Sequence, residues 1–183
     1  HDDSIDASGR FRRVQGDDTM KTLLLMRHAK SSWDDASLPD HDRPLNARGK
    51  KDAPRMGEWL VAQDLVPALI VSSSARRARK TADKVAAACG QPDDVSREPS
   101  LYHAGPEDWY AFVRALPADV DRALCIGHNP GLEEFVYRLT LTYVRMPTAA
   151  IAHIRLPVDT WSELDTGIDC ELVDVWRPKE LPA

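Results

Sequence analysis

Short apolar runs alternate with amphipathic segments along most of the chain, and this alternation constrains the fold more than any other feature of the sequence. Each apolar run has the length of a strand, and the segments between the runs carry apolar residues at helical spacing. Strands that alternate with helices are typical of a mostly parallel sheet covered by helices. The sequence therefore predicts an α/β fold, a three-layer sandwich with helices on both faces of a central, mostly parallel sheet.

Six segments are predicted as strands because they are short, apolar and bounded by polar or turn residues. They are residues 22–27, 69–72, 95–98, 123–127, 150–156 and 171–176. The segment at 95–98 has the weakest pattern. The last two strands follow the stretch LTYVRMPTAA and can pair differently from the others, so an antiparallel edge is compatible with the sequence.

Four helices are predicted between these strands from their apolar spacing and their end signals. The first covers about residues 46–63, and Pro54 inside it predicts a kink or a split into two segments. The second begins at a Ser74 cap and ends at Gly90, a residue that commonly stops helices. The other two follow proline residues, Pro106 and Pro130.

The length of the chain is typical of one domain. With 183 residues, of which 43% are hydrophobic, the chain can bury a substantial core. Residues 1–19 have neither an apolar run nor a periodic pattern, and we interpret Met20 as the natural start. We expect residues 1–19 to be a leader, tag-derived or poorly ordered, and residues 20–183 to form a single domain.

The composition argues against several classes of function. The net charge of -5 disfavours nucleic acid as the main partner, although it leaves room for a local basic site. The three cysteines are far apart and form no CxxC pair, so we expect a reducing compartment and a cytoplasmic location. No apolar run approaches the length of a membrane span, and no glycine-rich nucleotide loop is present.

Polar residues of one chemical kind follow three of the predicted strands. The strand at residues 22–27 ends in Arg27 and is followed by His28. The strand at residues 69–72 continues into SSSARRARKTA, and the strand at residues 123–127 continues into CIGHNPG, which contains His128. Ligands of such folds bind beyond the carboxyl ends of the strands. We therefore expect these three segments to meet at one edge of the sheet.

These residues suit an anion, above all phosphate. Arginine forks hold phosphate oxygens in pairs, and helix N-termini add backbone donors. Positive charge near a histidine favours its neutral form, which is a nucleophile. The sequence thus predicts that the strand-end histidine, His28, attacks phosphorus while arginines hold the oxygens.

Three motifs, in order, closely resemble those of the histidine phosphatase superfamily, which is known for an Arg-His-Gly signature: LLLMRHAKSSW, SSSARRARKTA and GHNPGLEEF. Within that family, the stretches RHAKS, DRPLNARGK and GHNPG are similar to SixA-type phosphohistidine phosphatases. The resemblance covers essentially residues 20–176. It implies a phosphoglycerate-mutase-like fold and hydrolysis without a metal, through a phosphohistidine intermediate.

The resemblance also implies roles for individual residues. His28 is the residue that accepts the phosphoryl group, and Arg27 is its phosphate-binding neighbour. The family's second arginine falls on Arg77, which becomes the second phosphate clamp, and His128 hydrogen-bonds the transferring phosphoryl group. The family's serine, alanine and threonine around the second arginine fall on Ser73, Ala78 and Thr81.

The polar stretch at residues 31–51, SSWDDASLPDHDRPLNARGKK, contains several aspartates and a histidine that could suggest a metal site. Metal ligands need convergent geometry, and a loop of this composition is usually solvated. We interpret it as a loop that flanks the active site, where Lys30 and Arg43 contact substrate and Asp42 orients a cation. Neither a metal nor another cofactor is expected.

The sequence departs from the family pattern in two places. Ala29 replaces the glycine of the signature. The stretch EPSLYHAGPEDW lacks the glutamate that larger members use as an acid, and its nearby substitutes are Glu98, His103 and Glu107. Without an acid, poor leaving groups such as sugar alkoxides are disfavoured. A phosphohistidine protonated on its other nitrogen needs less help, because it leaves as neutral imidazole.

The leading hypothesis is a metal-independent phosphatase that acts on phosphohistidine in a protein. The first alternative keeps the enzyme class but takes a small phosphate monoester, and the second is a phosphate-binding module without turnover. A nucleic-acid patch is disfavoured by the acidic net charge and the lack of interleaved aromatics. Its cations would be Arg76, Arg77, Arg79, Lys80 and Lys84.

Overall fold

The computed structural model describes residues 20–91 and 95–182. The leader expected over residues 1–19 lies outside the described residues. The described residues contain six strands, each of which ends within one residue of its predicted bounds. They are β1 (Lys21–Arg27), β2 (Leu69–Ser73), β3 (Val95–Glu98), β4 (Arg122–Gly127), β5 (Ile151–Leu156) and β6 (Glu171–Trp176).

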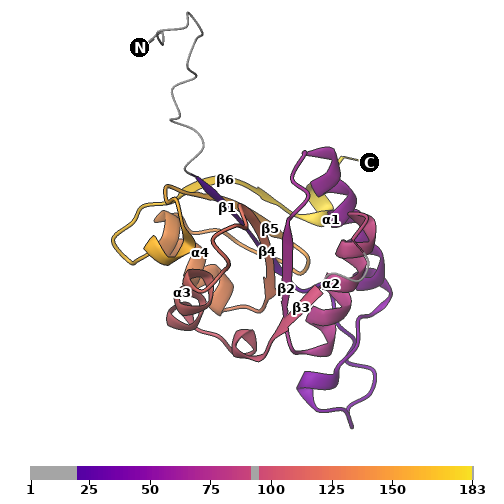
Figure 1. Ribbon diagram of the computed structural model, residues 1–183. Helices are drawn as coiled ribbons and strands as arrows, with labels where there is room; N and C mark the ends of the chain where they lie inside the picture. The colour runs from indigo at the N-terminus through magenta and orange to yellow at the C-terminus, as the bar shows by residue number, and fades with distance from the viewer. Residues whose placement is uncertain (1–19, 92–94, 183) are drawn as a thin grey trace, which may run out of the picture.

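The strands form one sheet in the order β3-β2-β4-β1-β5-β6 (Figure 1). The first four strands of this order run parallel, whereas β5 pairs antiparallel with both β1 and β6. The antiparallel edge that the sequence allowed is therefore confirmed. Since β1, β2 and β4 are parallel neighbours, the residues that follow them meet at one edge of the sheet.

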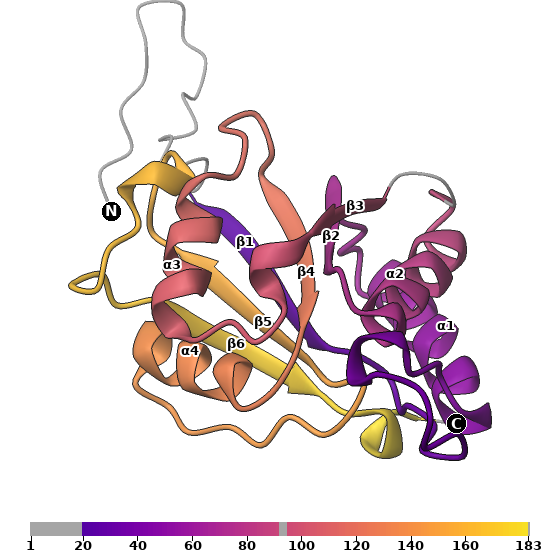
Figure 2. The same ribbon diagram turned by 90° about the horizontal axis from the view of Figure 1, so that it is seen from below.

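Two pairs of helices cover the two faces of the sheet, as predicted for a three-layer sandwich (Figures 1 and 2). The helices α1 and α2 lie on one face, and α3 and α4 lie on the other. Among the described residues, no helix is both long enough and apolar enough to cross a membrane. The bounds are α1 (Ala47–Ala62), α2 (Arg76–Ala88), α3 (Pro106–Arg114) and α4 (Gly131–Thr140).

The apolar run of β1 is continuous because both of its faces are buried. Leu23 and Leu25 belong to the core beneath α3 and α4, whereas Leu24 and Met26 belong to the core beneath α1 and α2. A strand with helices on both sides needs apolar residues at every position rather than at alternate ones. This central strand ends at the histidine that the sequence singled out.

The split into two segments that Pro54 allowed is not found, because α1 is one continuous helix with Pro54 inside it. Proline removes a single backbone hydrogen bond, here the one that the carbonyl of Lys50 would accept, and Lys50 is exposed to water. Ala53, Met56 and Leu60 are fully buried against the core on that side. Their packing holds the helix together across the proline.

The predicted Ser74 cap of α2 is wrong. Ala75 occupies the N-cap position, and no side chain caps this helix. The hydroxyl of Ser74 instead lies 3.0 Å from Nε2 of His41, in a loop 33 residues earlier in the chain. The helix does stop as predicted, since Gly90 follows it with a φ of 79°.

Candidate active site

One pocket at the carboxyl edge of the parallel strands contains all six residues that the sequence singled out for catalysis or substrate binding. Its volume is about 340 Å³. It also receives residues from the loop after β1, the loop before α3 and the segment before β5. The six predicted residues are Arg27, His28, Lys30, Arg43, Arg77 and His128.

His28 is buried at the exit of β1 with its Nδ1 atom 2.7 Å from the carbonyl oxygen of Ala29. A carbonyl oxygen can only accept a hydrogen bond, so Nδ1 carries the proton and Nε2 keeps a lone pair. Burial, with a smaller contribution from the nearby arginines, lowers the pKa of His28 to about 4. The imidazole is therefore neutral near pH 7 and can act as a nucleophile.

Arg77 lies in the first turn of α2, where it is buried beside His28. Its Nε atom donates to Nε2 of His28 at 3.4 Å. The hydroxyl of Thr81 donates to the carbonyl of Arg77 at 2.7 Å and accepts from the backbone N–H of Ala29 at 2.9 Å. This threonine therefore ties the exit of β1 to the start of α2, and it holds the guanidinium next to the imidazole.

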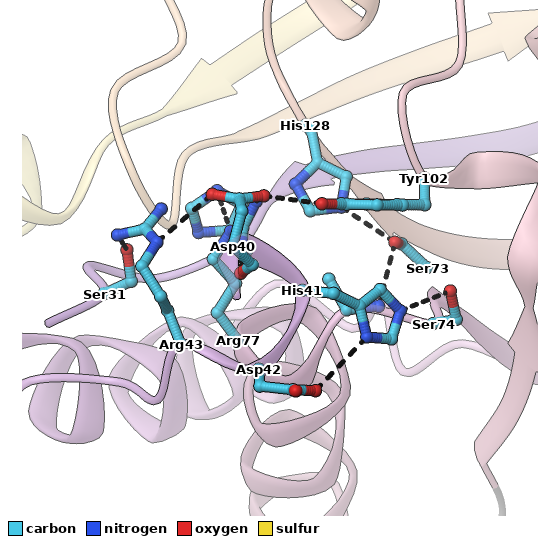
Figure 3. Close-up of polar contacts among 12 residues, drawn as sticks. Ser31, Asp40, His41, Asp42, Arg43, Ser73, Ser74, Arg77, Tyr102 and His128 are labelled. Atoms are coloured by element: carbon cyan, nitrogen blue, oxygen red, sulfur yellow. Dashed lines mark hydrogen bonds and ion pairs between the residues drawn. The ribbon is translucent and has the colours of Figure 1, made fainter. Parts of the chain in front are cut away.

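Asp40 is the functional candidate that the sequence missed. Its carboxylate accepts hydrogen bonds from Nη2 of Arg77 at 3.0 Å and Nε of Arg43 at 3.2 Å (Figure 3). It also accepts one from the hydroxyl of Tyr102 at 2.6 Å. The Tyr102 hydroxyl, followed by Arg77, holds the pKa of Asp40 well below its usual range. Asp40 is thus an ionised carboxylate inside the cationic pocket.

The expectation that Asp42 orients a cation is wrong. Its carboxylate lies 3.6 Å from Nδ1 of His41, and it points away from Arg43 and Arg77 (Figure 3). The short 3-10 turn at Asp40–Asp42 directs the first of its two aspartates toward Arg43. Both aspartates lie within three residues of that arginine, so the sequence spacing could not distinguish them.

Three residues of the pocket each have one buried polar atom without a protein partner in the described part of the chain. These atoms are Nε of Arg27, Nδ1 of His128 and Oδ1 of Asn129. Nη1 of Arg27 donates to the carbonyl of Met146 at 3.2 Å, and Nε2 of His128 hydrogen-bonds the hydroxyl of Ser73 at 2.8 Å. An unsatisfied buried polar group costs about 1–3 kcal/mol, so a polar ligand is favoured here.

The second histidine of the motif set lies beside the first. The ring centroids of His28 and His128 are 5.1 Å apart. Burial lowers the pKa of His128 to about 3, with smaller contributions from His28 and Arg77. Two uncharged imidazoles at this distance avoid the repulsion that two imidazolium ions would create.

The loop after β1 forms one wall of the pocket. Nη1 of the buried Arg43 donates to the hydroxyl of Ser31 at 2.9 Å. The guanidinium of Arg43 also stacks on Trp33, 3.5 Å from the ring centroid. The indole of Trp33 remains 71% exposed at the mouth of the pocket. The stacking and the hydrogen bond together fix the position of this third arginine.

Of the three proposed substitutes for an acid, only His103 lines the pocket. Glu98 accepts a hydrogen bond from the backbone N–H of Ser100 at 3.2 Å. Glu107 is exposed and pairs with Arg138 at 2.6 Å, which lowers its pKa. Neither glutamate is placed to protonate a group that is bound beside His28.

Glycine at two positions allows loops of the site to approach closely. A Cβ atom at Gly49 would overlap the carbonyl of Lys30, and a Cβ atom at Gly131 would overlap that of Ala104. The first contact places the loop after β1 on α1. The second holds the loop that carries His103 against the start of α4, beside His128.

The charges in the pocket favour an anionic ligand. Among its lining residues, Asp40 is the single acidic side chain, against the four cations Arg27, Lys30, Arg43 and Arg77. The described residues contain no group of three or more His, Cys, Asp or Glu side chains that could hold a metal ion. The donors present, arginine forks and a lysine, match phosphate oxygens rather than a cation.

The fold and the pocket together define an α/β protein that holds one buried and one half-buried histidine, both neutral near pH 7, among cations suited to phosphate. The chain belongs to the histidine phosphatase superfamily (branch 1), whose family model matches residues 23–109. The protein is therefore a phosphatase, a hydrolase. The resemblance to SixA-type members that the motifs predicted is confirmed by solved structures.

Three similar proteins illustrate this relationship. A putative phosphohistidine phosphatase SixA from Nakamurella multipartitia has 28% identity and a TM-score of 0.74, over 87% of this chain and 96% of that one. The protein histidine phosphatase SixA in complex with tungstate has 25% identity and a TM-score of 0.74, over 88% and 99%. An uncharacterized chloroplastic protein of Arabidopsis thaliana is 33% identical over 152 residues, 78% of this chain and 70% of that protein.

Proposed function

We propose that this phosphatase removes the phosphoryl group from phosphohistidine in a protein, through a phosphohistidine intermediate on His28. The observation that carries the proposal is the state of the His28 ring. Its Nδ1 proton is held by the carbonyl of Ala29, and its Nε2 lone pair lies 3.4 Å from Nε of Arg77. A neutral nucleophile beside a phosphate-binding fork is what phosphoryl transfer to histidine requires.

In the first step, Nε2 of His28 forms a bond to phosphorus while the phosphorus–nitrogen bond of the substrate breaks. The electron pair of that bond goes to the substrate imidazole, which leaves in its neutral form because its other nitrogen carries a proton. Phosphorylated His28 becomes an imidazolium. The hydrogen bond that Nδ1–H donates to the carbonyl oxygen of Ala29, with the nitrogen and oxygen 2.7 Å apart, stabilises its positive charge.

The phosphoryl oxygens are held by arginine side chains. Arg27 and Arg77 bind the non-bridging oxygens and offset the negative charge that they carry in the transition state, while Lys30 and Arg43 contribute further positive charge. His128 hydrogen-bonds the same phosphoryl group. In the second step, water attacks phosphorus, the bond to Nε2 breaks, and His28 returns to its neutral form as inorganic phosphate leaves.

Phosphohistidine is the favoured substrate because the pocket offers little acid catalysis. Asp40 is ionised and Glu107 is paired outside the pocket, so neither donates a proton near pH 7. A neutral imidazole leaves without such help. A structurally similar protein histidine phosphatase binds tungstate, a tetrahedral oxyanion like phosphate, which supports this assignment.

A small phosphate monoester is the second candidate, and the position of His103 favours it. This histidine lines the pocket on the side of Tyr102, with the two rings 3.9 Å apart. An imidazolium there could protonate an alkoxide as it leaves.

We further propose a cytoplasmic location, because Cys89, Cys125 and Cys170 are all free thiols.

Hydrolysis of a phosphohistidine protein, a sugar phosphate and an aryl phosphate, each in the presence of EDTA, tests the proposal. Phosphohistidine and the aryl phosphate should be hydrolysed, and the sugar phosphate poorly. Labelled phosphate should appear on the enzyme as an acid-labile, base-stable adduct that His28→Ala abolishes. His153→Ala, which alters a histidine in β5, is the control. Labelling that persists in His28→Ala would place the nucleophile elsewhere.

A further inference from the structure

A second cavity, rich in positive charge, lies next to the candidate active site. Its volume is about 180 Å³, and three separate parts of the chain contribute to it: α1, the segment before β5 and the segment after β6. The protein as a whole has a net charge of -5, so this concentration of positive charge is a local exception. The cations that line it are Arg48, Arg55, Arg145, Arg177 and Lys179.

One of these cations has a structural role. Arg55 donates from Nη1 to the carbonyl of Pro178 at 2.8 Å and from Nη2 to the carbonyl of Leu181 at 3.1 Å. These bonds fasten the segment after β6 to α1. Arg55 therefore explains how the wall of the cavity is built, but it does not explain the other four positive charges.

Two further cations are neutralised by acidic neighbours. Arg48 pairs with Asp52 at 3.6 Å, and Arg177 pairs with Glu180 at 3.1 Å. The ion pairs are partly exposed, so their contribution to stability is small and they exchange readily for other anions. Asp52 and Glu180 are the two acidic side chains that line the cavity.

Arg145 and Lys179 remain without a counter-charge. Both side chains are exposed, and neither forms a hydrogen bond or ion pair with another side chain in the part of the chain that the structure describes. Positive charges that share a cavity repel one another, and an anionic ligand relieves that repulsion. The cavity is therefore a candidate binding site for anions.

The cavity and the active-site pocket share a wall. Thr148 lines both of them, and Nη2 of Arg48 donates to its hydroxyl at 3.1 Å. A protein chain that presents a phosphorylated residue to His28 must lie across the surface beside the pocket. Side chains a few residues away from the phosphorylated residue can therefore reach this cavity.

We propose that this cavity binds aspartate or glutamate side chains of the phosphorylated protein, next to the residue that is dephosphorylated. The inference rests on the proposed function, since it names a feature of the protein substrate. The aliphatic rings of Pro147 and Pro178 line the cavity together with its cations. This combination suits a peptide with acidic side chains better than a second phosphate, which would require several free arginine forks.

The test compares two phosphohistidine peptides, one with acidic and one with neutral residues around the histidine. In the double variant Arg145→Glu with Lys179→Glu, KM for the acidic peptide should rise by about threefold to tenfold at low salt, with kcat unchanged. KM for the neutral peptide and for an aryl phosphate should stay constant. Added salt should reduce the difference between the peptides in the wild type.

The control variant, Lys84→Glu with Arg155→Glu, changes the net charge equally but at residues that do not line the cavity. Lys84 lies in the second half of α2. Arg155 lies in β5, opposite Thr22 in the strand register, and therefore near the edge of the sheet at which β1 begins. This variant should retain the wild-type preference for the acidic peptide. An equal loss in both variants would mean that only the overall charge matters, and it would overturn the inference.

Binding of the acidic peptide without its phosphoryl group, measured by fluorescence anisotropy, separates the inference from the proposed function. Weaker binding to the double variant than to the control would support the acidic subsite even if phosphohistidine were not hydrolysed. Unchanged binding would overturn it even if hydrolysis were fast. A greater effect on a small bisphosphate than on the acidic peptide would also contradict it, since the ligand would then be a second phosphate.

Discussion

Asp40 and Arg77 are joined by two hydrogen bonds, one from Nη2 to the carboxylate at 3.0 Å and one from Nη1 to the main-chain oxygen at 2.7 Å. The same guanidinium reaches Nε2 of His28 through its Nε atom. The proposed phosphate clamp is thus oriented by a carboxylate whose negative charge opposes the binding of an anion. Its two effects, orientation and repulsion, can be separated by substitution.

Asp40→Asn should make inorganic phosphate and vanadate stronger inhibitors, by roughly threefold to tenfold. The amide keeps the shape and the accepting oxygen of Asp40 but removes its negative charge. Asp42→Asn is the matched control, because Asp42 contacts His41 rather than the arginines. The inhibition constants of phosphate and vanadate, measured for the wild type and for both variants, test this prediction. Weaker inhibition of Asp40→Asn than of the wild type would contradict this. It would show that the orientation of Arg77 by Asp40 matters more for anion binding than the repulsion between Asp40 and the anion.

Arg77→Lys should lower kcat/KM by about 10²–10³-fold, because a lysine keeps the charge but loses the planar fork that holds two phosphoryl oxygens. Arg76→Lys, one residue earlier and exposed, should have little effect. Steady-state assays with an aryl phosphate compare the two variants. Equal losses in both would contradict the assignment of the clamp to Arg77.

His28 and His128 should stay neutral well below the pH at which exposed histidines gain a proton. Burial lowers their pKa values to about 4 and about 3. A proton NMR titration of the ring signals, assigned with His28→Asn and His128→Asn, measures both values. A midpoint near 6.5 for His28 would show that the ring is not held in its neutral form before substrate binds.

Stability should fall as the pH is lowered from about 6.5 to about 4. In this window the unfolded chain takes up protons on both histidines, with pKa values near 6.5, while the folded protein does not. Each histidine contributes a slope of about 1.4 kcal/mol per pH unit. The free energy of unfolding, measured with urea at several pH values, should depend less on pH in the double variant His28→Asn with His128→Asn than in the wild type. Equal slopes would count against depressed pKa values.

The rate should depend strongly on the basicity of the leaving group, because general acid catalysis typically contributes about 10²–10⁴-fold and the pocket offers no carboxylic acid. Measuring kcat/KM over a series of phosphate esters gives this dependence. Glu107→Ala should leave it unchanged, since Glu107 pairs with Arg138. A flat dependence that becomes steep in His103→Ala would identify His103 as an acid, and small phosphate esters would then become the better substrates.

The sequence alone was sufficient to predict the elements of the fold and the residues gathered at one sheet edge. The central strands β1, β2 and β4 were predicted to within one residue because a strand buried on both faces requires an unbroken apolar run, as Leu23–Met26 shows. His28 and His128 follow such strands directly, so their common edge is a consequence of parallel pairing. These features depend on patterns within a few neighbouring residues.

The partners of those residues were decided only by the tertiary structure. Asp40 meets Arg77 from 37 residues away and Tyr102 from 62 residues away, and Ser74 contacts His41 instead of capping α2. No local pattern distinguishes Asp40 from Asp42, because the choice depends on how the loop after β1 docks on α2 and on the loop before α3. Side-chain pairing across such distances is set by packing of the whole chain, whereas a strand buried on both faces is recognisable from its own residues.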